Sequence, residues 1–85
     1  MVHFKLDMRG IPLWLLQAYL EELGGHSTGA GYVEGEGWSA QLEQLEDYQI
    51  GSLRVGQVRL ELEASEEVFE RLHPQLEKKM MRAGG

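Results

Sequence analysis

Three residues in a glycine-rich segment have side chains that could bind a ligand or take part in catalysis. His26, Ser27 and Thr28 lie in a region where six of the fourteen residues 24–37 are glycine. Imidazole and hydroxyl groups donate and accept hydrogen bonds, and with an acid they could form a hydrolase triad. No Asp follows at a spacing that indicates such a triad. The segment also lacks the lysine and the following helix of a phosphate-binding loop. We therefore expect a flexible crossover, with His26, Ser27 and Thr28 as the candidate ligand loop.

The chain ends in Gly84-Gly85, the pair with which ubiquitin-like sulfur carriers also end. Two glycines can thread into the narrow channel of an activating enzyme, which then adenylates the terminal carboxylate. Such carriers open with a β-hairpin before their helix, whereas here a strand pattern leads directly into a helix pattern. A glycine-rich end that frays after a helix explains the same two residues. Both interpretations of the tail stay open.

The remaining ionisable residues match no catalytic or metal-binding motif. The sequence has no cysteine, which removes disulfides, thiolate metal ligands and cysteine nucleophiles. The spacing of His3, His26 and His73 fits no compact metal motif. Glu61 and Glu63 are two residues apart and share one face of a strand, where a solvated charged surface explains them. We predict no enzyme activity, no metal site and no cofactor.

Composition and charge limit the classes of partner. The 85 residues suit one domain, residues 1–85, and 42% of them are hydrophobic, which suffices for a core. Fourteen acidic against eight basic residues give a net charge of −6, which disfavours nucleic acid and anionic membranes as partners. No apolar run approaches the roughly 20 residues that span a bilayer, and the first residues lack the apolar core of a signal peptide. We therefore expect a cytoplasmic protein.

Alternating apolar and polar residues predict the strands that would position these side chains. Residues 2–8, 38–43 and 58–64 alternate in this way, so each strand has one buried and one wet face. Tyr32-Val33 and residues 53–55 predict two shorter strands. Short connections make the later strands antiparallel.

The segments between these strands are predicted as turns and connections. The polar residues 44–49 are interpreted as a connection, and residues 34–37 as a turn. Gly56-Gln57 is predicted to form a two-residue type II′ hairpin turn, because glycine stands in its first central place.

Two segments with helical spacing of apolar residues accompany the strands. The first helix is predicted to start at Pro12 and to end at Gly24-Gly25. Ser65 is expected to cap the second helix. Pro74 is expected to kink this helix or to make it restart after Leu72.

The predicted order is strand, helix, three or four strands, helix, which is an α+β fold of type β-α-β(3-4)-α. Two amphipathic helices on one face of an antiparallel sheet give the economical layered arrangement. The other face would then carry polar side chains, namely those of His3, Lys5, Asp7, Ser39, Gln41, Glu43, Arg54, Arg59, Glu61 and Glu63.

Over nearly its whole length the chain resembles a small uncharacterised domain of thermophilic bacteria. Core and turn residues carry the similarity, in the segments Phe4–Leu16, Tyr19–Gly25, Gly35–Trp38, Gly51–Leu53 and Val58–Glu61. The absence of cysteine and asparagine, with plentiful Glu and Arg, agrees with a thermophilic source. That domain also forms the C-terminal half of proteins related to the small subunit of molybdopterin synthase (MoaD-related proteins).

The resemblance implies a TATA-binding-protein-like fold with the order β-α-β4-α. It implies no established activity and transfers no catalytic residue. It also implies a link to molybdenum-cofactor biosynthesis by association, although these residues do not include the ubiquitin-like carrier half of the two-part proteins.

Three functions are compatible with these observations. The preferred interpretation is a non-catalytic interaction or accessory domain, whose open sheet face or edge strand docks a protein partner or a second copy of the domain. The first alternative is a carrier that is activated at the carboxylate of Gly85. The second is a binder of small molecules between the helices and the sheet.

Overall fold

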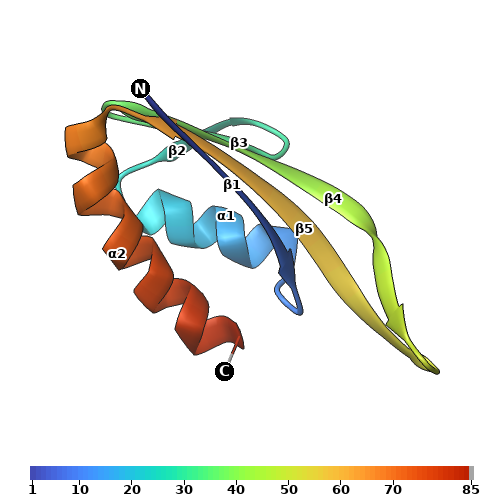
Figure 1. The fold of residues 1–85 in the computed structure, drawn as a ribbon. Coiled ribbons are helices and arrows are strands. Elements are labelled where there is room, and N and C mark those ends of the chain that lie inside the picture. Colours follow the sequence, from blue (N-terminus) through green and yellow to red (C-terminus); the bar gives the residue numbers. More distant parts are fainter. Residues whose placement is uncertain (85) are drawn as a thin grey trace.

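The computed structural model describes residues 1–84, which form an antiparallel sheet packed on two helices (Figure 1). The elements are β1 (Val2–Arg9), α1 (Leu13–Glu22), β2 (His26–Gly29), β3 (Tyr32–Gly35), β4 (Trp38–Ile50), β5 (Leu53–Ala64) and α2 (Glu66–Gly84). The five strands lie in the order β1-β5-β4-β3-β2, and each neighbouring pair is antiparallel. This confirms the α+β class and the order β-α-β-β-β-β-α. Neither helix in the described part of the chain is both long and apolar enough to cross a membrane.

Helix α1 begins one residue after the predicted start, because Pro12 is its N-cap, and it ends where its sequence predicts. Pro12 adopts an extended conformation (φ −74°, ψ 150°), and its carbonyl accepts the first helical hydrogen bond from the N–H of Leu16 at 3.2 Å. Gly24 has φ +103°, a conformation that glycine adopts without steric cost and that stops the helix. The helix buries Leu16 and Leu20 completely.

Helix α2 is a single element despite its internal proline. Ser65 caps it as predicted, because its Oγ accepts a hydrogen bond from the N–H of Val68 at 3.3 Å. The predicted restart after Leu72 is wrong, since the helix continues through Pro74. Pro74 is exposed, whereas Leu72 and Leu76 on either side of it are buried against the core. Burial of this continuous apolar stripe outweighs the hydrogen bond that the proline cannot donate.

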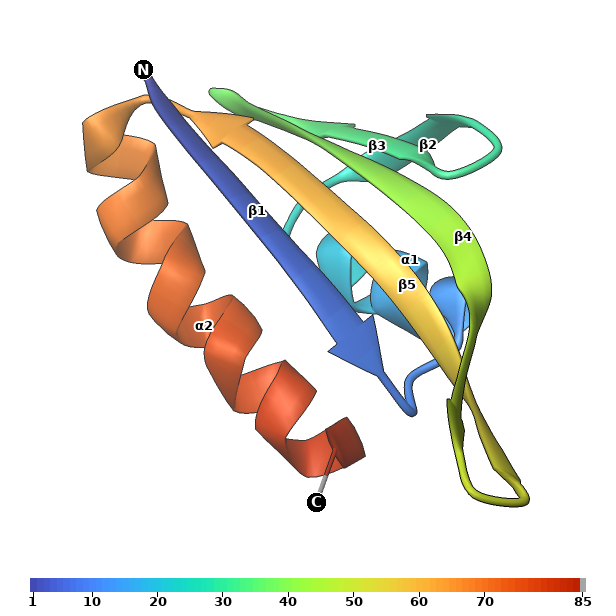
Figure 2. The ribbon, with the colours of Figure 1, turned by 45° about the vertical axis from the view of Figure 1, so that its right-hand side comes forward.

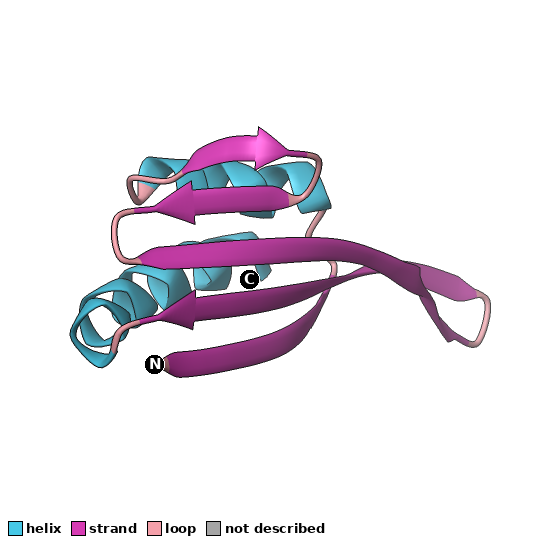
Figure 3. Ribbon diagram, turned by 90° about the horizontal axis from the view of Figure 1, so that it is seen from above, coloured by secondary structure: helices cyan, strands magenta, loops and turns pink. Residues whose placement is uncertain are grey.

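Both helices cover the same face of the sheet (Figure 3). Where the helices cover β4 and β5, the inward-pointing residues of the two strands are no more than 7% exposed; they are Trp38, Ala40, Leu42, Val58, Leu60, Leu62 and Ala64. They form one cluster with the buried leucines of α1 and α2. The core therefore lies between sheet and helices, and the opposite face of the sheet carries no covering layer among the described residues.

Strands β4 and β5 continue beyond the sheet as a two-stranded arm, residues 46–55 (Figures 1 and 2). The prediction of a connection at residues 44–49 is wrong, because these residues belong to β4. The prediction of a turn at Gly56-Gln57 is also wrong, because both residues lie within β5. The turn falls instead at Gly51-Ser52, where Gly51 has φ +60°. One ladder then joins the two strands, with a register shift between Leu45 and Tyr48.

The glycine-rich segment is a hairpin and not a loop. Residues 26–29 form strand β2 and pair with β3, so the predicted crossover loop is wrong. The glycines make room for Trp38. A β-carbon at Gly35 would lie 2.2 Å from the Trp38 indole, and one at Gly25 would lie 2.7 Å from it. These glycines are therefore packing residues, which composition alone does not distinguish from flexible ones.

Candidate interaction surface

The uncovered face of the sheet, called the outer face below, presents polar side chains in rows that cross the strands. Its members include His3, Lys5, Asp7, Arg9, His26, Tyr32, Glu34, Ser39, Gln41, Glu43, Gln57, Arg59, Glu61 and Glu63. They come from all five strands. Directly opposed residues of an antiparallel pair have Cβ atoms about 4.5–5.5 Å apart, so each row is a set of interacting neighbours.

The first row spans the whole sheet. Strand pairing places His26 opposite Glu34, Glu34 opposite Ser39, Ser39 opposite Glu63, and Glu63 opposite His3. A histidine thus stands at each end, with two carboxylates between them. These residues are spread over 60 positions in the sequence, and only the register of the four strand pairs brings them together.

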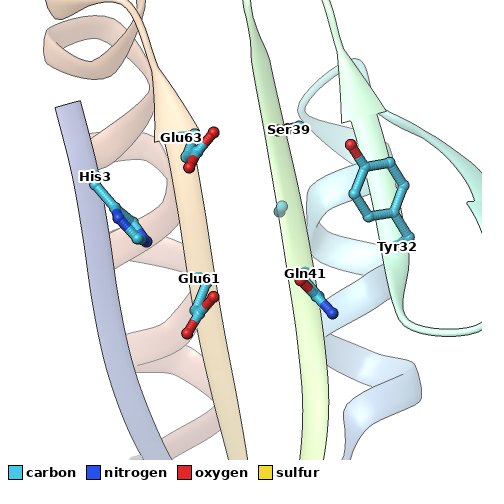
Figure 4. A pocket seen from close by; sticks show the side chains of 7 residues that line it. His3, Tyr32, Ser39, Gln41, Glu61 and Glu63 are labelled. Carbon is cyan, nitrogen blue, oxygen red and sulfur yellow. The ribbon is translucent and has the colours of Figure 1, made fainter. Parts of the chain in front are cut away.

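The second row encloses a shallow hollow with the first. It runs from Tyr32 through Gln41 and Glu61 to Lys5. The hollow has a volume of about 140 Å³ and is lined by His3, Tyr32, Ser39, Ala40, Gln41, Glu61 and Glu63. In Figure 4, His3 and the two glutamates lie on one side of it and the Tyr32 ring on the other.

A bidentate ion pair fixes the third row. Arg59 Nε lies 2.8 Å from Asp7 Oδ1, and Arg59 Nη2 lies 3.2 Å from Asp7 Oδ2. The two hydrogen bonds from the guanidinium lower the pKa of the Asp7 carboxyl below its ordinary value and raise the pKa of Arg59. Glu43 stands opposite Arg59 on its other side. This row ties β1 to β5.

The charge on the outer face is unevenly distributed. Lys5 Nζ lies 3.8 Å from Glu61 Oε1, a long contact between exposed side chains. Glu34 and Glu63 form no salt bridge with any residue in the described part of the chain. The end of the outer face around the hollow is therefore acidic, and the exposed side chains of His3 and His26 stand at the two ends of the row that crosses it.

The predicted ligand residues do not converge on one point. His26 belongs to the first row of the outer face, whereas Ser27 pairs with buried Val33 on the helix side. Ser27 Oγ accepts a hydrogen bond from Gln17 Nε2 at 2.8 Å and donates one to the carbonyl of Gly29 at 3.1 Å. Thr28 is exposed. A role of residues 26–28 in binding a ligand stays a prediction.

Two other candidate residues, His73 and Gly84, belong to α2. His73 is on α2, with Nε2 3.1 Å from Glu77 Oε1 and its ring stacked on Phe69 at 4.9 Å. Gly84 is the last residue of α2, and Gly85 lies outside the described residues. Within residues 1–84, no group of three or more His, Asp or Glu side chains is arranged to hold a metal ion.

One residue predicted for the outer face lies on the other side. Arg54 and Arg59 are five positions apart in the continuous strand β5, so their side chains point to opposite faces. Arg54 lines a hollow of about 440 Å³ with residues 10–12, at the start of α1. The prediction fails because it assumed a turn at Gly56-Gln57, which would have reset the alternation.

The space between helices and sheet is filled with side chains. Leu16, Leu20, Leu60, Leu62 and Leu76 meet there, and each has 0% of its surface exposed. Interiors packed in this way leave few voids larger than a water molecule. A small molecule bound between the helices and the sheet would have to displace this core.

The family assignment follows from comparison with known proteins. A family model described as archaeal MoaD-like protein matches residues 4–85. The chain belongs to the archaeal MoaD-like protein family. The matched residues of this archaeal MoaD-like protein take in every element from β1 to α2 and both final glycines. No curated protein matches the chain at a significant level.

Proposed function

We propose that this archaeal MoaD-like protein is a non-catalytic docking module whose outer face binds a protein partner. The observation that carries the proposal is the uncovered outer face, since both helices pack on the other side of the sheet. The outer face carries an exposed aromatic ring, a residue type that is enriched at protein–protein interfaces, and an uneven charge that gives specificity for a partner. Ser27 and Thr28 are the candidate nucleophiles. Among the described residues, neither side chain forms a hydrogen bond with a group that could act as its base.

The chemistry of the hollow indicates the kind of partner. Its volume of about 140 Å³ is below the roughly 300–1,000 Å³ of small-molecule pockets, so it suits a single side chain of a partner. Glu61 and Glu63 line it and Glu34 stands beside it, which favours a lysine or arginine. Tyr32, 38% exposed, offers a rigid aromatic surface of the type that anchors interfaces. We expect a basic segment of the partner to lie across the first two rows.

The test is capture of the partner by the native chain and its loss on charge removal. The protein is tagged at the N-terminus, so that Gly85 stays free, and partners from the native host are identified by mass spectrometry. The double variant Glu61→Gln, Glu63→Gln keeps side-chain shape but removes two charges from the hollow. We expect it to lose the specific partner, and we expect binding by the native chain to weaken steeply with salt.

A matched control removes the same charge from the helix side of the molecule. Glu21 and Glu70 are exposed on α1 and α2, so Glu21→Gln, Glu70→Gln should keep the partner. Equal capture by all three proteins would contradict docking at the outer face. Equal loss in both double variants would show a general charge effect and would also contradict it.

The link to molybdenum-cofactor biosynthesis is part of the same proposal. It is supported by membership of the archaeal MoaD-like family. Recovery of molybdopterin-synthase subunits in the capture experiment is the expected result. Recovery of a specific partner from an unrelated process would contradict the link while leaving the docking module intact.

A second candidate is a carrier activated at its C-terminal carboxylate. The family match includes Gly84-Gly85, which supports it. The fold weakens it, because β1 leads directly into α1 without an opening hairpin and α2 extends as far as Gly84. Deletion of Gly84-Gly85 tests this function: a carrier loses adenylation and its pathway fails, whereas a docking module keeps its partner.

A further inference from the structure

The two edges of the sheet differ in their capacity to accept another strand. Strand β1 has eight residues in unbroken register with β5 and contains no proline. In Figure 3 it forms one margin of the sheet, and no element lies beyond it. Strand β2, at the other margin, has four residues and a register shift between Ser27 and Gly29. A long, regular edge is a template for pairing, whereas a short, irregular edge is protected from it.

We propose that two copies of the chain associate through β1, antiparallel to each other, about a two-fold axis at Leu6. The pairing joins two five-stranded sheets into one continuous sheet, with all four helices on the same side. It uses the edge of the sheet, so it does not depend on a partner at the outer face. The two outer faces become one surface.

The alternation of β1 restricts the register. Two β1 strands related by a two-fold axis perpendicular to the sheet keep outer residues opposite outer residues only if one residue lies opposite its own copy. The axis is named by that residue. An axis at Lys5 would place Lys5 opposite Lys5 of the second copy, which is unfavourable for like charges. An axis at Leu6 places Lys5 opposite Asp7 of the second copy, and it does so twice because of the symmetry. An axis at Met8 would also pair opposite charges, Asp7 with Arg9, but it would match only residues 7–9 of β1, whereas an axis at Leu6 matches residues 3–9. Charge complementarity and the length of the ladder together select Leu6.

Both charged groups can accept this extra contact. The Lys5 side chain is 54% exposed, and its contact with Glu61 is long at 3.8 Å. Asp7 is 41% exposed, and its two bonds to Arg59 leave further acceptor sites on the carboxylate. The second copy's Lys5 completes a network of Arg59, Asp7 and lysine on each side of the axis.

The helix side of β1 supplies the apolar part of the interface. Phe4 and Leu6 are only half-buried, although their partners in β5, Leu62 and Leu60, are completely buried. The difference arises because β1 has a neighbour on one side only. In the proposed register Leu6 lies opposite Leu6, and Phe4 lies opposite Met8 of the second copy. Association would bury these side chains further.

The other long unpaired edge is unsuited to self-association. Pairing with β3 ends at Gln41, and the N–H of Leu42 still donates to the carbonyl of Gly31; beyond Leu42, β4 has a free edge along its remaining residues. Glu43, Glu46 and Asp47 lie along it, with the register shift in the same stretch. Two copies would bring these acids together, so repulsion disfavours pairing there.

Cysteine cross-linking tests the register, because the sequence contains no cysteine of its own. In a Leu6→Cys variant the two thiols face each other across the axis, at a Cα separation of about 4.5–5.5 Å that a disulfide spans. Under mild oxidation this variant should form a covalent dimer rapidly. Lys5→Cys, one position off the axis, and Thr28→Cys, on the β2 edge, should form it slowly. Cross-linking of either control as fast as Leu6→Cys would overturn the proposal.

Sedimentation of proteins without cysteine tests the association itself. The native chain should reach twice the chain mass at micromolar concentration. Lys5→Glu places two acids opposite each other on both sides of the axis and should raise the dissociation constant at least tenfold. Lys78→Glu makes the same charge change on exposed α2 and should leave it unchanged. A native chain that stays monomeric, or a Lys5→Glu variant that associates normally with native circular dichroism, would overturn the proposal.

Discussion

Replacement of Gly35 by alanine should destabilise the protein strongly, although the backbone conformation at Gly35 permits alanine. Gly35 has no positive φ, so the new methyl group introduces no backbone strain. Its β-carbon would lie 2.2, 2.3 and 2.5 Å from three atoms of the Trp38 indole. Carbon atoms in favourable contact are about 3.5–4.0 Å apart, so the indole would have to move by roughly 1 Å or more.

The indole has little room for this movement. Trp38 is 7% exposed, and the backbone at Gly25 approaches the far end of its ring. Overpacking of this severity costs about 3 kcal/mol, the upper part of the usual range. Alanine also restricts the unfolded chain, which offsets about 0.4–1 kcal/mol of that cost. The expected net loss is about 2 kcal/mol, or a fall in Tm of roughly 8–16 °C for a domain of this size.

Thermal unfolding followed by circular dichroism measures this loss. Gly56→Ala is the matched control, because Gly56 also has no positive φ and a β-carbon there meets no atom within 4 Å. Its Tm should be unchanged or slightly higher. Trp38→Phe shortens the ring system. In a protein that carries it, Gly35→Ala should lower Tm less than it does in the native chain. A Gly35→Ala variant as stable as Gly56→Ala would refute the account of the glycine-rich hairpin as a packing feature.

Two further predictions concern stability. The pKa of Asp7 is lowered in the folded protein, so its pairing with Arg59 stabilises the fold at pH values above 3.8, the ordinary pKa of Asp. This contribution is lost as the pH falls through the pKa that Asp7 has in the folded protein. The Tm difference between the native chain and Asp7→Asn should therefore be largest near neutral pH and shrink below about pH 3.8; a difference independent of pH would contradict the ion pair. Pro74→Ala should raise Tm, because alanine restores a helical N–H at an exposed position inside α2. The free energy of unfolding should increase by up to about 3 kcal/mol. A lower Tm would contradict this and would mean that the proline ring makes a stabilising contact with the apolar stripe of α2.

The order of elements could be predicted from the sequence because the core strands alternate cleanly. Residues 2–8 and 58–64 lie against the helices, and burial of every second side chain leaves a period of two in the sequence. The end of α1 and the cap of α2 could equally be predicted, since Gly24 accepts a positive φ and the Ser65 hydroxyl accepts a hydrogen bond from the first turn of the helix.

The arm could not be predicted in the same way. Residues 46–50 are solvent-exposed on both sides of a two-stranded ribbon, so no alternation marks them as a strand. Two glycine-led pairs, Gly51-Ser52 and Gly56-Gln57, fit a tight hairpin turn equally well by composition. The ladder that β4 and β5 form with each other decides between them, and it depends on contacts distant in sequence.

The outer face shows the same limit at the level of function. Its side chains Glu61 and Glu63 were correctly expected on one face, because the alternation of β5 fixes it. Tyr32 and His26 were not expected there, because their place depends on a hairpin that the glycines concealed. The first row needs the register of four strand pairs, and no local pattern contains that information.

The most direct test of docking at the outer face is site-specific photo-cross-linking in the native host. A photoreactive phenylalanine analogue replaces Tyr32, at the hollow, in one protein and Trp14, 70% exposed on α1, in another. We expect a specific cross-link from position 32 to the protein that the native chain captures, and no cross-link from position 14. The cross-link from position 32 should be lost when the protein also carries Glu61→Gln and Glu63→Gln. A cross-link from position 14 alone, or none from position 32 when the partner is present, would contradict docking at the outer face.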